Sequence, residues 1–146
     1  MAYRTITPPE AYAALQGEPG VVYLDVRTAE EFEAAHPAGA HNVPVLLFDS
    51  TTRQAAPNPD FLPTVEKHLP RSTVLIVGCQ SGVRSRRACD LLERAGYQDV
   101  RNVDGGFGGA RDQSGRLVVP GWRDAELPVE TGQTPGVCYA DLRRAT

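Results

Sequence analysis

The sequence predicts an α/β domain in which a mostly parallel central sheet is flanked by helices on both faces. Short runs of apolar and β-branched residues, typical of strands buried on both faces, recur along the chain. They alternate with segments of helical periodicity, which favours parallel strands joined by helical crossovers. A length of 146 residues suits one domain built around one hydrophobic core.

Four strands are expected. The runs at 21–26 (VVYLDV) and 73–78 (TVLIVG) are mostly apolar and rich in β-branched residues, which favours buried strands. One more short strand is expected within 97–103, and a brief one at 41–45. The polar, proline-rich stretch 50–59 predicts a loop.

Capping boxes mark the starts of two expected helices. Thr7 with Glu10 opens a helix that ends near Leu15, and Thr28 with Glu31 opens a short second one. The expected helices cover residues 8–15, 29–35, 60–69 and 85–95, with a last helical turn near 139–144.

We expect one domain over residues 1–132, with a long loop at 108–121, followed by a C-terminal tail at 133–146. Glycines paired with glycine, serine and proline mark turns in this loop. The loop follows the last expected strand. It either walls the mouth of a site at that end of the sheet or is a tolerated surface loop.

The composition excludes several classes of function. A total of 15 Lys and Arg against 18 Asp and Glu gives a net charge of −3, so no basic face for nucleic acid is expected. No apolar run approaches the roughly 20 residues that span a bilayer, and no secretory signal is visible at the start. Three scattered cysteines do not look like a disulfide framework. We therefore expect a cytoplasmic protein with no nucleic-acid or membrane partner.

The segment from Cys79 to Ser85 (CQSGVRS) joins the run at 73–78 to the helix expected from Ser85. Loop amides and the first N–H groups of that helix can converge on the cysteine sulfur, where the helix dipole favours negative charge. A thiolate held there is a nucleophile at neutral pH. Gly82 permits a left-handed backbone, and Arg84 adds a charge suited to oxyanions. We therefore predict that Cys79 is catalytic.

The alternative interpretation of Cys79 is a small buried apolar residue at the end of a strand. That interpretation suits Cys89, which lies inside an expected helix beside its apolar stripe. Cys138 lies in a segment flanked by proline and glycine and is assigned no role.

Asp25 and Arg27 follow the first expected strand, and in parallel sheets sites lie at the carboxyl ends of strands. Asp25 could hydrogen-bond the Cys79 loop and hold its shape, so we predict supporting roles for both residues. The spacing of Arg27 and Glu31 also allows a purely local ion pair. The spacing of cysteines and histidines matches no metal site.

Signatures along nearly the whole chain, in the right order, resemble the rhodanese homology domain. They are Leu24-Asp25-Val26-Arg27 with Glu31-Phe32, the run from His36 to Pro44, the loop from Cys79 to Ser85, Asp104-Gly105-Gly106-Phe107, and then Trp122 and Leu127-Pro128-Val129. In compact members of that family the tryptophan follows the glycine pair within a few residues, so the resemblance also marks 108–121 as an insertion.

The resemblance implies a sulfurtransferase that carries sulfur as a persulfide on Cys79. A small anionic donor such as thiosulfate loads the sulfur, and cyanide or a thiol, including a protein thiol, removes it. The resemblance also implies that the loop binds substrate and cradles the persulfide, through Gln80, Ser81, Gly82, Val83, Arg84 and Ser85. No metal or organic cofactor is implied.

Two other functions stay open on the sequence alone. The domain could bind a biosynthetic partner or relay the persulfide to it, although an intact Cys79 loop counts against a purely binding module. A cysteine phosphatase is the less favoured alternative. Protein tyrosine phosphatases place five residues between cysteine and arginine, whereas four separate Cys79 from Arg84 here.

Overall fold

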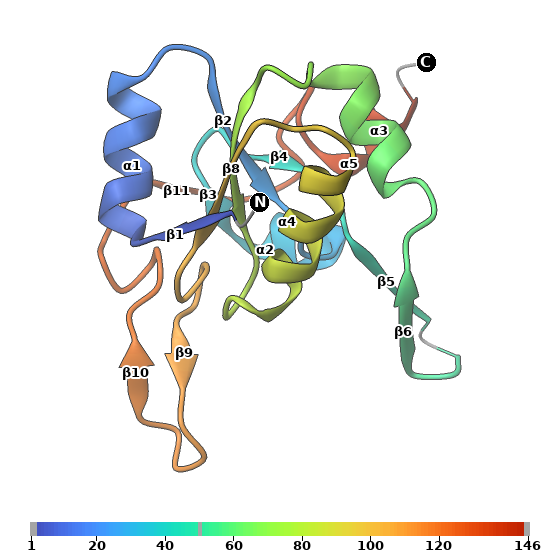
Figure 1. Ribbon diagram of the computed structural model, residues 1–146. Helices are drawn as coiled ribbons and strands as arrows, with labels where there is room; N and C mark the ends of the chain where they lie inside the picture. Colours follow the sequence, from blue (N-terminus) through green and yellow to red (C-terminus); the bar gives the residue numbers. More distant parts are fainter. Residues whose placement is uncertain (1–2, 50, 145–146) are drawn as a thin grey trace.

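The computed structural model describes residues 3–49 and 51–144, and its centre is a sheet of five parallel strands (Figure 1). Their order across the sheet is β1 (Arg4–Ile6), β8 (Asp99–Val103), β7 (Val74–Gly78), β2 (Val21–Asp25) and β4 (His41–Asn42). Every neighbouring pair runs parallel. The predicted fold class is confirmed. The strand β1 was not predicted from the sequence.

Helices cover both faces of this sheet because side chains on successive strand residues point to opposite faces. Tyr23 of β2 and Ile76 of β7 pack with α1 (Pro8–Gly17) and with Phe32 of α2 (Ala29–Ala34). On the other face, Leu24 and Leu75 pack with α3 (Phe61–His68), α4 (Val83–Arg94) and α5 (Tyr139–Arg144). The carboxyl ends of the central strands therefore emerge between two helical layers.

Both predicted capping boxes are formed. The Thr7 side chain accepts a hydrogen bond from the Glu10 amide, and Thr28 accepts one from Glu31. In contrast, α4 begins at Val83, two residues before the predicted start at Ser85. The reason is Gly82, whose φ of 106° places the N-cap in the left-handed region that favours glycine.

The loop predicted at 50–59 is partly wrong, because β5 (Leu46–Asp49) and β6 (Gln54–Pro57) form an antiparallel hairpin. The sequence of β6, QAAP, has no β-branched or aromatic residue to signal a strand, and all four residues are exposed. Backbone pairing with the more apolar β5 creates the strand instead. The Asp49 side chain accepts a hydrogen bond from the Thr51 amide (2.8 Å) in the turn.

The segment predicted as a loop insertion, 108–121, is also a hairpin, formed by β9 (Ala110–Arg111) and β10 (Leu117–Val119). Its turn is organised by Asp112, whose carboxylate accepts hydrogen bonds from the amides of Ser114 (2.9 Å) and Arg116 (3.0 Å). Both hairpins project from the end of the molecule where the loop between β7 and α4 lies (Figure 1).

The segment after the second hairpin packs along the domain as far as residue 144. A short strand β11 (Val129–Glu130) pairs with β3 (His36–Pro37). The Asn58 side-chain amide donates to the Tyr139 hydroxyl of α5 (3.0 Å). Within residues 3–49 and 51–144, no helix is long and apolar enough to cross a bilayer.

Candidate active site

Cys79 lies directly after β7, and its side chain is buried between that strand and the start of α4. The backbone N–H of Gly82 donates to the sulfur at 3.1 Å. The sulfur also lies 3.4 Å from the Ser85 hydroxyl, in the first turn of α4. A helix of 12 residues therefore begins against this sulfur, with its positive dipole end toward it.

The six residues predicted to form the cradle occupy three kinds of position. Gly82 and Ser85 contact the sulfur, whereas the side chains of Gln80, Ser81 and Val83 lie at the exposed side of the loop. Val83 is 71% exposed. The sixth residue, Arg84, lies in the first turn of α4.

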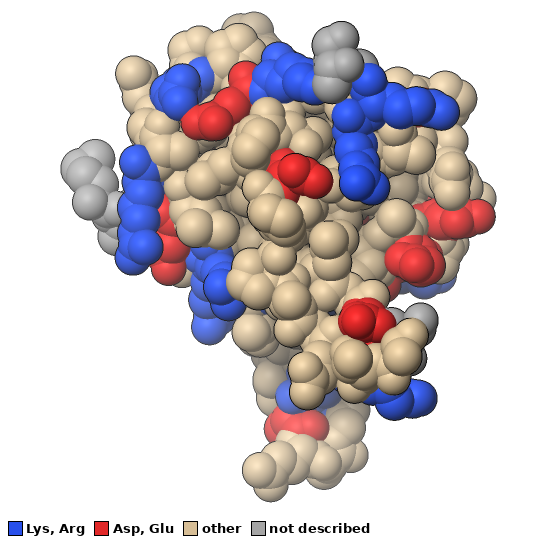
Figure 2. Space-filling model, turned by 90° about the vertical axis from the view of Figure 1, so that its right-hand side faces the viewer, with Lys and Arg blue, Asp and Glu red and all other residues tan. Residues whose placement is uncertain are grey.

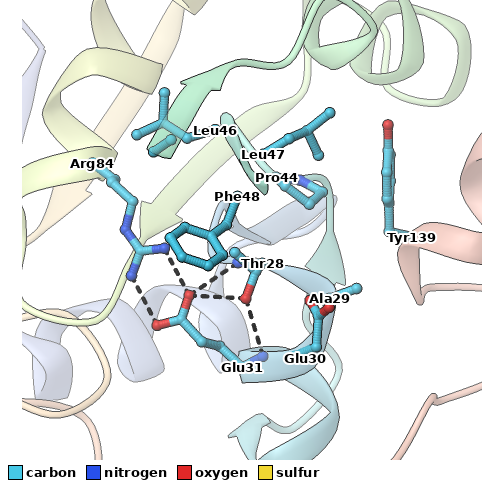
Figure 3. A pocket seen from close by; sticks show the side chains of 11 residues that line it. Thr28, Ala29, Glu30, Glu31, Pro44, Leu46, Leu47, Phe48, Arg84 and Tyr139 are labelled. Atoms are coloured by element: carbon cyan, nitrogen blue, oxygen red, sulfur yellow. Dashed lines mark hydrogen bonds and ion pairs between the residues drawn. The ribbon is translucent and has the colours of Figure 1, made fainter. Parts of the chain in front are cut away.

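Arg84 is bound to Glu31 of α2 rather than left open to solvent (Figure 3). Two parallel hydrogen bonds of 2.7 and 2.9 Å join its guanidinium to the carboxylate. Burial alone would raise the pKa of Glu31, but the hydrogen bonds from Arg84 and Thr28 lower that pKa to about 2. Much of the charge of Arg84 is therefore already compensated.

Glu31 consequently does not form the local pair with Arg27 that its spacing also allowed. Arg27 instead binds Asp25 through two buried hydrogen bonds, Nε to Oδ1 (3.0 Å) and Nη2 to Oδ2 (2.7 Å). Its remaining Nη1 donates to the Gln80 side chain at 3.2 Å, and its guanidinium lies 4.5 Å from the centre of the Phe107 ring. Arg27 thus contacts the loop directly, and Asp25 orients Arg27.

Asn102 of β8 is a site residue that sequence reasoning missed. It is fully buried, and its Oδ1 accepts a hydrogen bond of 2.5 Å from the Ser85 hydroxyl. Its Nδ2 has no hydrogen-bond partner among the residues described. The available signal was a polar amide inside a strand with buried neighbours, since buried polar groups usually serve a hydrogen-bond network.

The glycine pair after β8 forms the other side of the loop. The amides of Phe107 and Gly108 donate to the carbonyls of Cys79 (2.7 Å) and Gln80 (2.9 Å). Gly106 has a φ of 57°, and a side chain there would collide with the Cys79 carbonyl. The second hairpin is therefore anchored at its base to the backbone that holds the sulfur.

The other two cysteines are also free and buried. Cys89 is fully buried in α4 within the apolar core, and burial raises the pKa of its thiol strongly. Cys138 packs in the cluster on the opposite face of the sheet. Both contexts are explained by packing.

The model of the rhodanese-like domain family matches residues 7–112. The chain belongs to this family. A rhodanese-like relative from Arabidopsis thaliana, thiosulfate sulfurtransferase 16, chloroplastic, is 46% identical over 85 residues, which are 58% of this chain and 69% of the relative.

A second rhodanese-like relative, thiosulfate sulfurtransferase GlpE of Haemophilus influenzae, is 30% identical over 90% of this chain and 98% of its own length. Among solved structures, that of Rv0390 from M. tuberculosis superposes with a TM-score of 0.74 at 29% identity, covering 90% of this chain and all of the other. Family membership and the names of these relatives support a rhodanese-type sulfurtransferase activity.

Proposed function

We propose that this rhodanese-like domain moves sulfane sulfur from an anionic donor such as thiosulfate to cyanide or a thiol, through a persulfide on Cys79. The observation that carries the proposal is the position of the Cys79 sulfur. The sulfur accepts a hydrogen bond from the Gly82 amide at 3.1 Å and faces the start of α4. A negatively charged sulfur is stabilised there by an amide and a helix dipole.

The reaction has two displacement steps. The Cys79 thiolate attacks the outer sulfur of thiosulfate, the bond between the two donor sulfurs breaks, and sulfite leaves with the electron pair. In the second step an acceptor thiolate attacks the outer sulfur of the persulfide, and the Cys79 thiolate is released. Cyanide as acceptor gives thiocyanate. A covalent intermediate between two substrates predicts ping-pong kinetics.

Ser85 and Asn102 extend the cradle on the buried side of the sulfur. In the arrangement described, the thiol donates to Ser85 and Ser85 donates to Asn102 Oδ1. Turning the Asn102 amide would let its Nδ2 donate to Ser85, whose hydroxyl would then be free to donate to the charged sulfur. We assign both residues a positioning role in stabilising the thiolate and the persulfide.

Arg84 is expected to act mainly by joining α4 to α2 through Glu31. An anionic donor must compete with the Glu31 carboxylate for this guanidinium. The amide of Gly82 and the dipole of α4 are then left as the main attraction for the donor. Arg27 and Asp25 keep their proposed supporting roles, because Arg27 contacts both Gln80 and Phe107.

Intact-mass measurement after thiosulfate treatment tests the proposal. The parent protein should gain one sulfur atom, lose it to cyanide and release thiocyanate. Cys79→Ser should gain none, whereas Cys89→Ala and Cys138→Ala should load like the parent. An aryl phosphate offered in parallel tests the phosphatase alternative. Loading of the Cys79→Ser variant would contradict the proposal.

We also propose that the protein works in a reducing compartment such as the cytoplasm. The reaction cycle requires a free thiol at Cys79, and all three cysteines are free. Cys89 lies within the apolar core, where burial raises the pKa of its thiol and disfavours the reactive thiolate.

A further inference from the structure

A cavity of about 800 Å³ lies between the first hairpin and the start of α2 (Figure 3). A volume of this order suits a small-molecule ligand. Its walls combine the apolar side of β5 with the first turn of α2 and with one side chain each from α4 and α5. The lining residues are Thr28, Ala29, Glu30, Glu31, Pro44, Leu46, Leu47, Phe48, Ala55, Arg84 and Tyr139.

The cavity is bounded by the two elements that flank the reactive sulfur. Thr28 follows the carboxyl end of β2, whose last residue, Asp25, is paired with Gly78 next to the cysteine. Arg84 comes two residues after Gly82, whose amide contacts the sulfur. A ligand held in this cavity therefore lies against the first turn of α4, the helix that begins directly after the Cys79 loop.

The hairpin wall of the cavity is apolar and open to solvent. Leu47 is 42% exposed and Phe48 is 58% exposed. Figure 2 looks onto the side of the molecule that carries this hairpin, and its middle is largely uncharged, with charged side chains of both signs around it. Large apolar side chains exposed beside a cavity are typical of a ligand-binding surface.

The charges that line the cavity disfavour an anionic ligand. Arg84 is the one basic residue among the lining residues described, and it is already bound to Glu31 through two hydrogen bonds. Glu30 lines the same cavity and adds a further carboxylate. An acceptor that carries its own carboxylates would meet net negative charge here.

We propose that this cavity is the acceptor site, and that it selects a thiol with an apolar body and no charge. This inference rests on the sulfurtransferase function proposed above. The apolar body packs on Phe48 and Leu47, and the thiol reaches past Arg84 to the persulfide. The acceptor loses its thiol proton to solvent and attacks the outer sulfur. The bond between the two persulfide sulfurs then breaks, which releases the Cys79 thiolate.

The test uses the full chain loaded with sulfur from thiosulfate and discharged by phenylmethanethiol, 2-mercaptoethanol or glutathione at equal thiolate concentrations. We expect phenylmethanethiol to discharge the parent fastest and glutathione slowest. Phe48→Ser should slow discharge by phenylmethanethiol roughly tenfold, as expected for losing part of an aromatic contact. It should leave discharge by 2-mercaptoethanol nearly unchanged.

Val118→Ser is the matched control. Val118 lies on the second hairpin and is 56% exposed, close to the 58% of Phe48, but it does not line the cavity. This variant should discharge all three thiols like the parent. An equal loss in both variants, or an unchanged ratio of the phenylmethanethiol rate to the 2-mercaptoethanol rate in Phe48→Ser, would overturn the inference.

A binding measurement separates this inference from the proposed function. Benzyl methyl sulfide has the same apolar body as phenylmethanethiol but cannot react, so it can be titrated into the protein without any sulfur loading. We expect amide resonances of Leu46 to Phe48 to shift in NMR spectra, and Phe48→Ser to weaken binding. Failure to load sulfur from thiosulfate would refute the sulfurtransferase, whereas absence of these shifts would refute the acceptor site.

Discussion

The two hairpins differ in how they relate to the site, although they look alike. Both project from the end of the domain that holds the Cys79 loop, and each presents an exposed apolar side chain, Phe48 or Val118. The hairpin β5–β6 lines the cavity beside Arg84, whereas the base of β9–β10 is joined to the loop by backbone hydrogen bonds from Phe107 and Gly108. Exposure of an apolar residue therefore says little until its surroundings are known.

The same contrast changes which segment we expect to determine the choice of acceptor thiol. The second hairpin arises from the insertion at 108–121, which follows the last sheet strand and was a candidate wall for the site. Its base does lie against the loop, since Gly108 donates to the Gln80 carbonyl. The residues of its strands, however, do not line the cavity. The first hairpin lies there instead, in a stretch whose second half was expected to be a loop.

The largest effect is expected when the Cys79 sulfur is removed, at the end of the domain from which both hairpins project. Cys79→Ser should lower thiosulfate:cyanide transfer by at least about a thousandfold, because no other nucleophile replaces the thiolate. Cys89→Ala, inside the helix, is the control and should retain most of the activity. Initial rates of thiocyanate formation measure the activity of both variants. Substantial transfer by Cys79→Ser would show that Cys79 is not the sulfur carrier.

The attachment of the second hairpin is tested by two glycines, one at its base and one in its turn. Gly106→Ala should destabilise the protein by about 2–4 kcal/mol, because the methyl group meets the Cys79 carbonyl and φ is 57°. Gly115→Ala, in the turn with a φ of 87° and open space around it, should cost only about 1 kcal/mol. Urea unfolding compares them, and equal losses would mean that the base is no anchor.

The buried side of the sulfur lies away from both hairpins and can be tested through Asn102. Asn102→Asp replaces an amide that can donate with a carboxylate that accepts, so the Ser85 hydroxyl is drawn away from the sulfur. We expect sulfur loading to slow by roughly tenfold, the effect of one lost hydrogen bond to a charged group. The pH profile of Cys79 alkylation should move to higher pH.

Asn102→Ala separates this role from packing, since it removes side-chain volume without giving the Ser85 hydroxyl an acceptor that draws it away from the sulfur. It should retain a near-parental pH profile even where its stability falls. A shift of equal size in both Asn102 variants, or an unmoved profile in Asn102→Asp, would limit Asn102 to a structural role.

The role of Arg84, which lines the cavity, can be tested by removing the carboxylate of its partner Glu31. Glu31→Gln should lower the KM for thiosulfate about threefold, because an anion no longer competes with a carboxylate for the guanidinium. It should also raise the relative rate with glutathione. Steady-state kinetics measure both effects, and an unchanged KM would mean that donor binding does not use Arg84.

The same variant has a defined pH dependence. The folded-state pKa of Glu31 is about 2, below its ordinary value of 4.5. A lowered pKa stabilises the folded protein above the unfolded-state value, and this contribution is lost as pH falls through the folded-state value. The stability advantage of the parent over Glu31→Gln should therefore shrink between about pH 4.5 and pH 2 in thermal melts.

The smallest effect is expected for the second hairpin itself. Replacing residues 110–119 with a short turn should change the discharge rates of the three thiols by less than about twofold, because none of these residues lines the cavity. Sulfur loading should be unchanged. A reordered ranking of thiols in a folded variant would restore the insertion as the wall of the site.

The sequence by itself determined the features that depend on neighbours in the chain. Both capping boxes join residues three apart, and apolar runs identified the central strands and the loop that follows β7. These interactions are local, so periodicity and spacing are enough to predict them. The cysteine between a buried strand and a glycine-containing loop was identifiable for the same reason.

Tertiary structure decided which side chains meet across the elements. Arg84 and Glu31 are 53 residues apart, and Ser85 and Asn102 are 17 apart on a helix and a strand. Arg27 had an acidic residue at suitable spacing on each side, and only the packed domain selects Asp25. Likewise, β6 becomes a strand by pairing with β5 rather than through its own composition. Such choices depend on register and burial, which exist only once the sheet and its helices are assembled.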